Sequence, residues 1–139
     1  MKTTGHTSAG PLSFEKGGYV ARFAQSGDDI RAAQALRHLC FVERAGRAPM
    51  PDARESDAFD ELCDHVLIEA NGVLVCCFRV LPLASGRDVD TSYSAQFYDL
   101  DALKTRRFGM VELGRFCVDR SVQDAGVLRV AWGMLAAYV

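Results

Sequence analysis

The stretch Gly109–Val130 reads GMVELGRFCVDRSVQDAGVLRV, and its first half has the pattern of a β-strand. Met110–Val118 is an apolar run of strand length that carries two charges, Glu112 and Arg115, in its interior. A charge inside a buried strand is costly unless it is paired or used. A polar turn that ends near Gly126 follows, and a helical pattern begins after it. We therefore expect this stretch to be the functional centre of the chain.

The spacing of the two charges matters because side chains alternate along a strand. Glu112 and Arg115 are three positions apart, so they share a face only if one extra residue lies between them. Gly114 would tolerate such a β-bulge, and a bulge frees a backbone N–H group that can polarise a carbonyl oxygen. The alternative is a plain strand with one charge on each face.

The turn after this strand has the character of an anion site. A strand that leads through a glycine-containing turn into a helix presents the first N–H groups of the helix to a ligand. We predict that the turn Asp119–Val127 carries a phosphate group, with Arg120 adding a positive charge. The alternative is a plain connection in which Gly126 serves only close packing.

The composition is that of one globular domain. Of the 139 residues, 49% are hydrophobic and 24% charged, which is typical of a folded protein rather than a disordered one. The net charge of −2 argues against a general nucleic-acid binder. Residues 1–18 are rich in glycine, serine and threonine and are expected to form a flexible tail, followed by the domain over residues 19–139.

Cysteine usage and hydropathy favour a cytoplasmic protein without a metal centre. Cysteines stand at positions 40, 63, 76, 77 and 117 without a C-x-x-C pair, which favours reduced, buried thiols. Cys63 and His65 have no second ligand pair, so we expect no zinc site. Met1–Gly10 lacks the apolar core of a signal peptide, and no apolar run approaches the length that spans a membrane.

Apolar periodicity and turn residues divide the rest of the chain into strands and helices. Asn71-Gly72 favours a two-residue hairpin between two strands. In chain order we expect a strand over Tyr19–Ala24, a helix from about Ser26 to Arg44, a loop over Gly46–Ser56, strands over His65–Ala70 and Val73–Leu81, a loop over Pro82–Ser92, a short helix over Tyr93–Leu103 and a helix over Val127–Val139. This order makes an α+β fold of the α/β-sandwich type.

One arginine and an acidic run are the strongest charge features outside the opening stretch. Arg79 lies in the middle of an apolar strand, where a guanidinium needs a carboxylate; Glu112, Asp57 and Asp60 are the candidates. The segment Asp52–Asp64 contains six acids against one base. Clustered carboxylates near a cleft would hold a cationic amine. The alternative is a simply solvated acidic run.

Four short motifs, in this order, resemble the GNAT-type N-acyltransferases. They are Leu36-Arg37 followed by Phe41, Asp57-Ala-Phe59-Asp60, Phe78-Arg79-Val80-Leu81-Pro82 and Glu112-Leu-Gly-Arg115-Phe116. Together they are similar to the branch that depends on acyl carrier protein, which includes the acyl-homoserine-lactone synthases and the ornithine N-acyltransferases. The stretch Tyr93–Leu100 resembles the ornithine enzymes more closely. Leu128 stands where GNAT enzymes usually have Gly or Ala, which favours a carrier-protein donor over coenzyme A.

The resemblance implies a reaction and a set of site residues. The reaction moves a (3-hydroxy)acyl group from the phosphopantetheine of acyl carrier protein to the α-amine of ornithine, the first step of ornithine-lipid synthesis, with no bound cofactor and no metal. The residues implied are Glu112, Arg115, Asp57 and Asp60 in catalysis; Arg37, Phe41, Arg79, Phe97 and Phe116 in substrate binding; and Arg120, Gln123 and Gly126 in phosphopantetheine binding.

In the implied mechanism, N–H groups near Gly114 polarise the thioester carbonyl and Glu112 accepts a proton from the amine. The three arginines of the motifs hold Glu112 and the two aspartates in place, or bind the carboxylate of the amino acid. The alternative is a purely structural ion-pair network. Lys104, Arg106 and Arg107 are candidates for docking an acidic carrier protein; the alternative there is an ordinary solvated basic patch.

The resemblance also implies that the chain holds only the N-terminal half of the GNAT-type fold, a mixed, mostly antiparallel sheet with helices on both faces. We therefore expect an unpaired edge on the strand Met110–Val118, an exposed apolar face on the last helix, and either self-association or an inactive chain. Two other functions stay open: an acyl-homoserine-lactone synthase, and a non-catalytic fragment or binding module. A peripheral contact at the inner membrane face is a further expectation for the partners.

Overall fold

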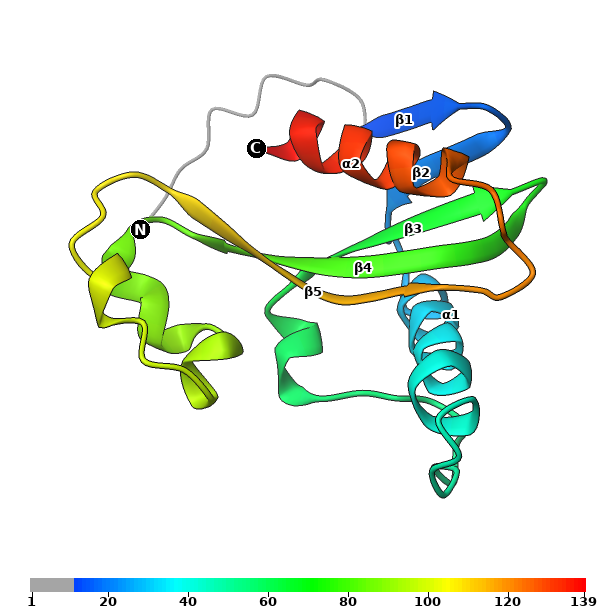
Figure 1. The fold of residues 1–139 in the computed structure, drawn as a ribbon, viewed down its shortest axis with the longest axis horizontal. Helices are drawn as coiled ribbons and strands as arrows, with labels where there is room; N and C mark the ends of the chain where they lie inside the picture. Colours follow the sequence, from blue (N-terminus) through cyan, green and yellow to red (C-terminus); the bar gives the residue numbers. More distant parts are fainter. Residues whose placement is uncertain (1–11) are drawn as a thin grey trace.

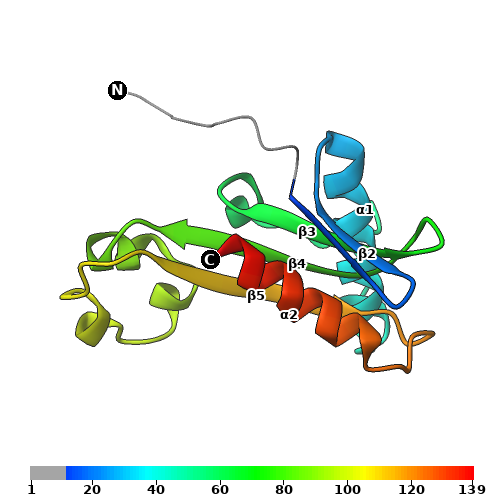
Figure 2. The ribbon, with the colours of Figure 1, turned by 90° about the horizontal axis from the view of Figure 1, so that it is seen from above.

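The computed structural model describes residues 12–139, which form one antiparallel sheet with a helix on each face. The five strands lie in the order β1-β2-β3-β4-β5, and every neighbouring pair is antiparallel. Helix α1 packs against one face and α2 against the other, as Figures 1 and 2 show. The predicted α+β class with helices on both faces is confirmed.

Most element boundaries agree with the sequence to within a few residues. The strands are β1 Ser13–Lys16, β2 Tyr19–Phe23, β3 Asp64–Ala70, β4 Val73–Leu83 and β5 Met110–Val118. The α-helices are α1 Gly27–His38 and α2 Gly126–Tyr138, and a π-helical turn, Leu39–Glu43, continues α1. The short 3₁₀ helices are Ala58–Glu61, Gly86–Thr91, Ser94–Gln96 and Asp101–Leu103.

The described part of the predicted tail is a strand, so the expectation was wrong for residues 13–16; residues 1–11 lie outside the described residues. Strand β1 pairs with β2 through a turn whose two glycines, Gly17 and Gly18, have positive φ angles of 61° and 84°. Phe14 anchors this strand by packing against the core under α2. One aromatic residue in a polar stretch was too weak a pattern to predict a strand.

Two cores hold the helices to the sheet. The larger lies under α2 and joins its buried residues, including Val130 and Met134, to β-strand residues such as Ile68 and Phe78. The smaller lies under α1, where Leu36 and neighbouring side chains meet Cys77 of β4. Because side chains alternate along β4, one face of this strand feeds each core. The site described below lies on the α1 face.

Strand β5 contains a β-bulge, one residue after the predicted position at Gly114. Cys77 pairs with Cys117 and Arg79 with Gly114, so two residues of β5, Arg115 and Phe116, face a single residue of β4. Arg115 takes a left-handed φ of 50°, which costs a non-glycine residue about 1–2 kcal/mol. The extra residue is therefore Arg115 itself, and Gly114 stays in register.

The segment between β4 and β5 differs from prediction. Strand β4 continues to Leu83, and the expected loop and helix over residues 82–103 become three 3₁₀ turns. Asp99 accepts a hydrogen bond from the N–H of Asp101 at 3.0 Å, and this side-chain turn separates the last two turns. Val89 and Leu103 pack with Leu83 in a third apolar cluster. The apolar residues of this segment are therefore spaced for packing against Leu83, and their spacing does not reflect one continuous helix.

One sheet edge is unpaired and one helix stripe exposes apolar side chains, as expected. Within residues 12–139, β5 pairs with β4 alone, so its outer edge is free. On α2, Leu128 is 41% exposed and Trp132 58%, and Val139 after the helix is 79% exposed. Leu128 and Trp132 are four residues apart, so they lie on one stripe of the helix. Open edges and apolar stripes of this kind favour association.

We predict that the chain self-associates through this stripe. The double variant Leu128→Ser with Trp132→Ser should shift the chain from higher-mass species toward monomer, because it removes exposed apolar area without touching the core. Size-exclusion chromatography with light scattering measures this. Val73→Ser, at a position 64% exposed on the β3–β4 hairpin, is the matched control. A monodisperse monomer of the unmodified chain would contradict the prediction.

Candidate active site

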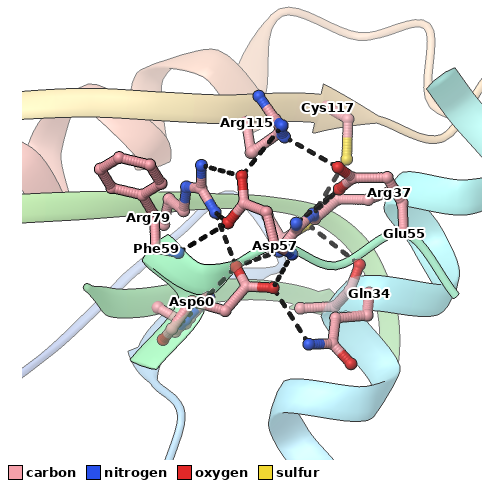
Figure 3. A network of polar contacts seen from close by, with 12 residues as sticks. Gln34, Arg37, Glu55, Asp57, Phe59, Asp60, Arg79, Arg115 and Cys117 are labelled. Atoms are coloured by element: carbon pink, nitrogen blue, oxygen red, sulfur yellow. Dashed lines mark hydrogen bonds and ion pairs between the residues drawn. The ribbon is translucent and has the colours of Figure 1, made fainter. Parts of the chain in front are cut away.

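Six charged side chains form a closed ring on the α1 face of the sheet. Arg37 of α1, Arg79 of β4 and Arg115 of β5 supply the cations, and the segment before β3 supplies the carboxylates. Each arginine bridges two carboxylates and each carboxylate bridges two arginines, as Figure 3 shows. In order the ring is Glu55, Arg37, Asp60, Arg79, Asp57 and Arg115, with N–O distances of 2.5, 2.7, 2.8, 2.5, 3.1 and, back to Glu55, 3.1 Å.

The inner half of the ring is buried. The side chain of Arg37 is 1% exposed and that of Arg79 3%, and Asp60 between them is 6% exposed. The predicted burial and pairing of Arg79 are confirmed, with Asp57 and Asp60 as its partners. Three positive and three negative charges cancel. A ring of full charges tolerates burial because each charge has two opposite neighbours.

Local sequence places the two aspartates. Asp57 and Asp60 form a capping box around the 3₁₀ helix Ala58–Glu61. The carboxylate of Asp57 accepts the backbone N–H of Asp60, and the carboxylate of Asp60 accepts the backbone N–H of Asp57. Gln34 of α1 donates to Asp60 at 3.1 Å, and the ring of His65 contacts the Asp60 carbonyl oxygen at 2.8 Å. The D-x-x-D spacing therefore fixes two carboxylates at once.

The ring keeps its acids ionised. Burial by itself would raise the pKa of Asp60, but hydrogen bonds from Arg37, Arg79 and Gln34 outweigh it and lower that pKa to about 2. The pKa of Asp57 is lowered in the same way, with burial opposed by hydrogen bonding to Arg79 and the charge of Arg115. Both carboxylates are therefore charged at neutral pH, and neither is placed to act as a proton donor.

Aromatic side chains cover the outer half of the ring. The Arg115 guanidinium lies 4.9 Å from the ring centroid of Tyr93, and that of Arg79 lies 5.7 Å from the same ring and 5.8 Å from Phe59. Stacking of this kind suits the planar guanidinium. This stacking, together with the ion pairs to Glu55 and Asp57, holds Arg115 in its left-handed backbone conformation.

Glu112 stands outside the ring, which corrects the expectation that the arginines hold it. Its two carboxylate oxygens accept the backbone N–H groups of Tyr93 at 2.8 Å and Ser94 at 2.9 Å. Glu55, which the sequence analysis did not single out, takes the expected place beside Arg37 and Arg115. Glu55 lies in the acidic run Asp52–Asp64, and the run was the one indication that could have pointed to it.

Glu112 and Arg115 nevertheless face one hollow, as the bulge requires. A cavity of about 210 Å³ is lined by both residues, by Gly114 between them and by Arg79 and Tyr93, among others. A carboxylate has about four lone-pair positions, and the two backbone bonds leave the others free. The bulge therefore brings a charged carboxylate and an irregular stretch of strand backbone to the same space.

A larger cavity of about 500 Å³ adjoins the outer half of the ring. It is lined by Cys40, Phe41, Val42, Ala45, Arg47, Glu55, Tyr93, Arg115 and Phe116. Phe41 and Phe116, two of the predicted substrate-binding residues, therefore meet here. Arg37 and Arg79 lie beneath in the ring. Phe97 is 64% exposed and packs on Tyr93 with ring centroids 5.3 Å apart, outside this cavity.

The turn before α2 holds two carboxylates of its own. Asp119 accepts the N–H of Ser121 at 2.9 Å, and Asp124 accepts the N–H of Gly126 and the hydroxyl of Tyr19. The cap residue of α2, Ala125, provides no side-chain cap for the N–H groups of the first turn. Gln123 lines a groove of about 300 Å³ here, and Arg120 is exposed.

The cysteines and histidines of the described residues are not grouped around a common centre. Across residues 12–139 no group of His, Cys, Asp or Glu has the geometry of a metal site. Cys76, Cys77 and Cys117 are buried, Cys40 and Cys63 are half-buried, and all five are free thiols. In the described part of the chain, no helix is long and apolar enough to cross a bilayer.

The fold therefore places a bulged strand beside a ring of ion pairs, and this strand runs into a turn and a helix N-terminus, which is the arrangement that the resemblance to GNAT-type acyltransferases implies. The comparison of sequences then gives the family: the chain belongs to the family described as "Acetyltransferase (GNAT) domain", which matches residues 36–133. The predicted family is confirmed, and the chain is a member of the GNAT acyltransferases.

Within this family, the chain is similar to curated proteins named L-ornithine N(alpha)-acyltransferase. The L-ornithine N(alpha)-acyltransferase of Rhodobacter capsulatus is 35% identical over 143 aligned residues, which cover 95% of this chain and 53% of that protein. The protein of the same name from Brucella abortus is 30% identical, over 88% of this chain and 48% of that protein. The chain therefore spans about half the length of the curated relatives it matches.

Solved structures agree on the fold. The acyl-homoserine-lactone (AHL) synthase LasI superposes with a TM-score of 0.59 at 20% identity, over 86% of this chain and 65% of that one. FeeM, an N-acyl amino acid synthase from uncultured soil microbes, superposes with a TM-score of 0.60 at 16% identity, over 86% and 64%. At these identities the likeness establishes the fold alone.

We predict that Arg79→Ala lowers the free energy of unfolding by about 3–5 kcal/mol, because it leaves Asp60 buried beside an empty space. Urea denaturation followed by circular dichroism measures the change. Arg54→Ala, at a surface pair with Asp52, is the matched control and should cost less than about 1 kcal/mol. Equal effects of the two substitutions would contradict the structural role of the ring.

The lowered pKa values predict acid sensitivity. Because the pKa of Asp60 is about 2 in the folded chain and 3.8 ordinarily, the unfolded state binds more protons in acid. The stabilisation is complete above pH 3.8 and disappears as the pH falls toward 2. Urea denaturation between pH 6 and pH 2 measures the slope, which should become shallower in Asp57→Asn. A stability that is constant from pH 4 to pH 2 would contradict this prediction.

Proposed function

We propose that this chain provides the donor- and acceptor-binding half of an N-acyltransferase that moves a (3-hydroxy)acyl group from acyl carrier protein to the α-amine of ornithine. The observation that carries the proposal is the closed ion-pair ring, which fixes Arg115 and the bulge of β5 between two cavities. The names of the relatives support ornithine as the acceptor.

Attack of an amine on a thioester requires three features at the site: groups that polarise the carbonyl, a base that accepts the amine proton, and space for the departing thiol. The amine nitrogen attacks the carbonyl carbon, an oxyanion forms, and the carbon–sulfur bond breaks as the thiol departs with a proton. In our proposal the irregular backbone at Gly114–Phe116 points N–H groups at the oxyanion. Glu112 receives the amine proton, directly or through a water molecule.

The donor is proposed to approach along β5 from the turn. The phosphate of phosphopantetheine would bind in the first turn of α2, where the cap residue Ala125 supplies no side-chain cap, with Arg120 and Gln123 beside it. Asp119 accepts the N–H of Ser121, and Asp124 accepts the N–H of Gly126 and the hydroxyl of Tyr19. Because Asp124 already occupies the first N–H group of α2, the phosphate would use the N–H groups of the residues that follow Gly126. The arm would then follow β5 toward the bulge.

The acceptor is proposed to bind in the larger cavity. Among the described residues no carboxylate pairs with Arg47, so its guanidinium is available to the α-carboxylate of an amino acid. Glu55 at the floor attracts an ammonium group, and Phe41 and Phe116 border the space. In this pose the α-amine points to the bulge. Ornithine, with one carboxylate and two ammonium groups, matches these charges.

Product analysis tests the proposal. The 139 residues are fused to the C-terminal part of the Rhodobacter capsulatus relative that the chain does not cover, and mixed with 3-hydroxyacyl-carrier protein and ornithine. Mass spectrometry should detect N-acylornithine from the fusion and none from the chain alone. A homoserine lactone formed from S-adenosylmethionine would instead support a synthase, and a folded fusion without any product would support a binding module.

Variants of the fusion separate catalysis from structure. Glu112→Gln should lower kcat by about 10²–10⁴-fold, the usual contribution of a general base, with little change in KM for ornithine. Arg47→Ala should raise KM for ornithine and leave KM for the carrier protein unchanged. Arg54→Ala is the matched control for the loss of a surface guanidinium. Normal turnover by Glu112→Gln would contradict the role of this carboxylate.

A further inference from the structure

The segment between β4 and β5 forms a lobe at one end of the sheet, away from both α-helices (Figure 1). This lobe, residues 84–109, carries three large exposed aromatic side chains: Phe97 is 64% exposed, Tyr98 70% and Phe108 61%. Soluble proteins bury most of their aromatic surface, so several exposed rings in one short segment indicate a contact surface.

The same lobe contains a basic hollow of about 470 Å³, lined by Ser85, Arg87, Lys104, Thr105, Arg106 and Arg107. No acid lines it. Lys104 is largely neutralised by Asp90 and Asp101, at 3.2 and 2.7 Å. Across residues 12–139, no carboxylate forms an ion pair with any of the three arginines of the hollow. The hollow therefore offers guanidinium and hydroxyl groups, which suit a phosphate.

The hollow is built into the fold rather than assembled by mobile side chains alone. The N–H of Gly86 donates to the carbonyl of Arg106 at 2.9 Å, so the two walls are joined by a backbone hydrogen bond. A Cβ atom at Gly86 would lie 2.2 Å from the carbonyl oxygen of Leu103. Only glycine permits this approach, which places Arg87 and the Lys104–Arg107 stretch around one space.

Aromatic and basic groups are in contact at the edge of the hollow. The Arg106 guanidinium lies 5.7 Å from the centroid of the Phe108 ring. The lobe holds four basic residues and four aspartates, so its formal net charge is zero and its positive character is confined to the hollow. Exposed aromatic rings beside unpaired arginines are typical of surfaces that rest at a lipid–water boundary, where the rings enter the headgroup region and the cations meet phosphates.

We propose that residues 84–109 dock this domain on an anionic lipid bilayer, with the basic hollow on a lipid headgroup phosphate and Tyr98 and Phe108 in the interfacial region. The residues proposed to touch the bilayer, which are those of the basic hollow with Tyr98 and Phe108, line neither of the two cavities beside the ring, whereas Tyr93 and Ser94 of the same lobe belong to the site. It fits the proposed function, since an acylated amino acid is amphiphilic and partitions into a membrane, but its test does not depend on that function.

The position of the lobe argues against the acidic carrier protein as its occupant. The nine residues of β5 separate the lobe from the turn before α2, a distance of about 27 Å at the rise of a β-strand. A carrier protein whose phosphate group is bound at that turn would have to extend along the whole of β5 to reach Arg106 and Arg107. We therefore assign the lobe to a different partner, and the test below distinguishes that partner from the carrier.

Vesicle flotation tests the proposal with the chain as it is. The chain should float with vesicles of mixed phosphatidylglycerol and phosphatidylcholine, and bind at least about tenfold more weakly to phosphatidylcholine alone and at high salt. Arg106→Glu with Arg107→Glu should weaken binding by about 30-fold or more. Tyr98→Ser with Phe108→Ser should weaken it at every salt concentration, because apolar contact is not screened.

The matched control is Lys16→Glu with Arg31→Glu, which makes the same charge change at exposed positions outside the lobe and should bind like the unmodified chain. Thermal unfolding confirms that every variant is folded. Equal binding by the lobe and control variants would overturn the proposal, as would equal binding to both kinds of vesicle. Absence of vesicle binding, with salt-sensitive binding of acyl carrier protein that Arg106→Glu abolishes, would also overturn it and assign the surface to the carrier.

Discussion

The ion-pair ring is the constraint on which the site depends. Three elements far apart in the sequence, α1, β4 and β5, each contribute one arginine, and a single short segment contributes all three carboxylates. The ring therefore joins α1 to the sheet at the bulge of β5. Without the ring, the left-handed backbone of Arg115 would lack the contacts that offset its conformational free-energy cost, and regular pairing of β5 with β4 would be favoured.

Most of the fold could be predicted from the sequence because the local sequence patterns agree with the tertiary contacts. Asn71-Gly72 set the hairpin, Ser26 capped α1, and the apolar run of β5 survived as a strand. The misses share a cause. Strand β1 is held by one half-buried phenylalanine, Phe14, and the 3₁₀ turns after β4 are held by packing on Leu83, so neither has a periodic pattern of its own.

Part of the site could also be predicted, because some of its charges lie in strand patterns that were themselves predictable. The burial and pairing of Arg79 were predictable because a lone guanidinium in an apolar strand must be paired. The odd spacing of Glu112 and Arg115 made a bulge one of two possibilities, and the structure has it. Two of the three candidate partners of Arg79, Asp57 and Asp60, are its partners. The third, Glu112, is not, and Glu55 takes the place beside the arginines that was expected of Glu112. The choice depends on which backbone N–H and guanidinium groups lie within reach in three dimensions.

The neutrality of the ring decides how the neighbouring cavities can discriminate ligands. Its three positive and three negative charges cancel, so it presents little net field to a ligand. What remains in the larger cavity is the exposed Arg47, which lies outside the ring. In the proposed binding mode Arg47 therefore supplies the net charge that selects a carboxylate, while Glu55 shares its charge with Arg37 and Arg115 and attracts an ammonium group only weakly. A substitution of Arg47 should then change the preference for the acceptor while the ring, and the strand geometry that it fixes, stay as they are.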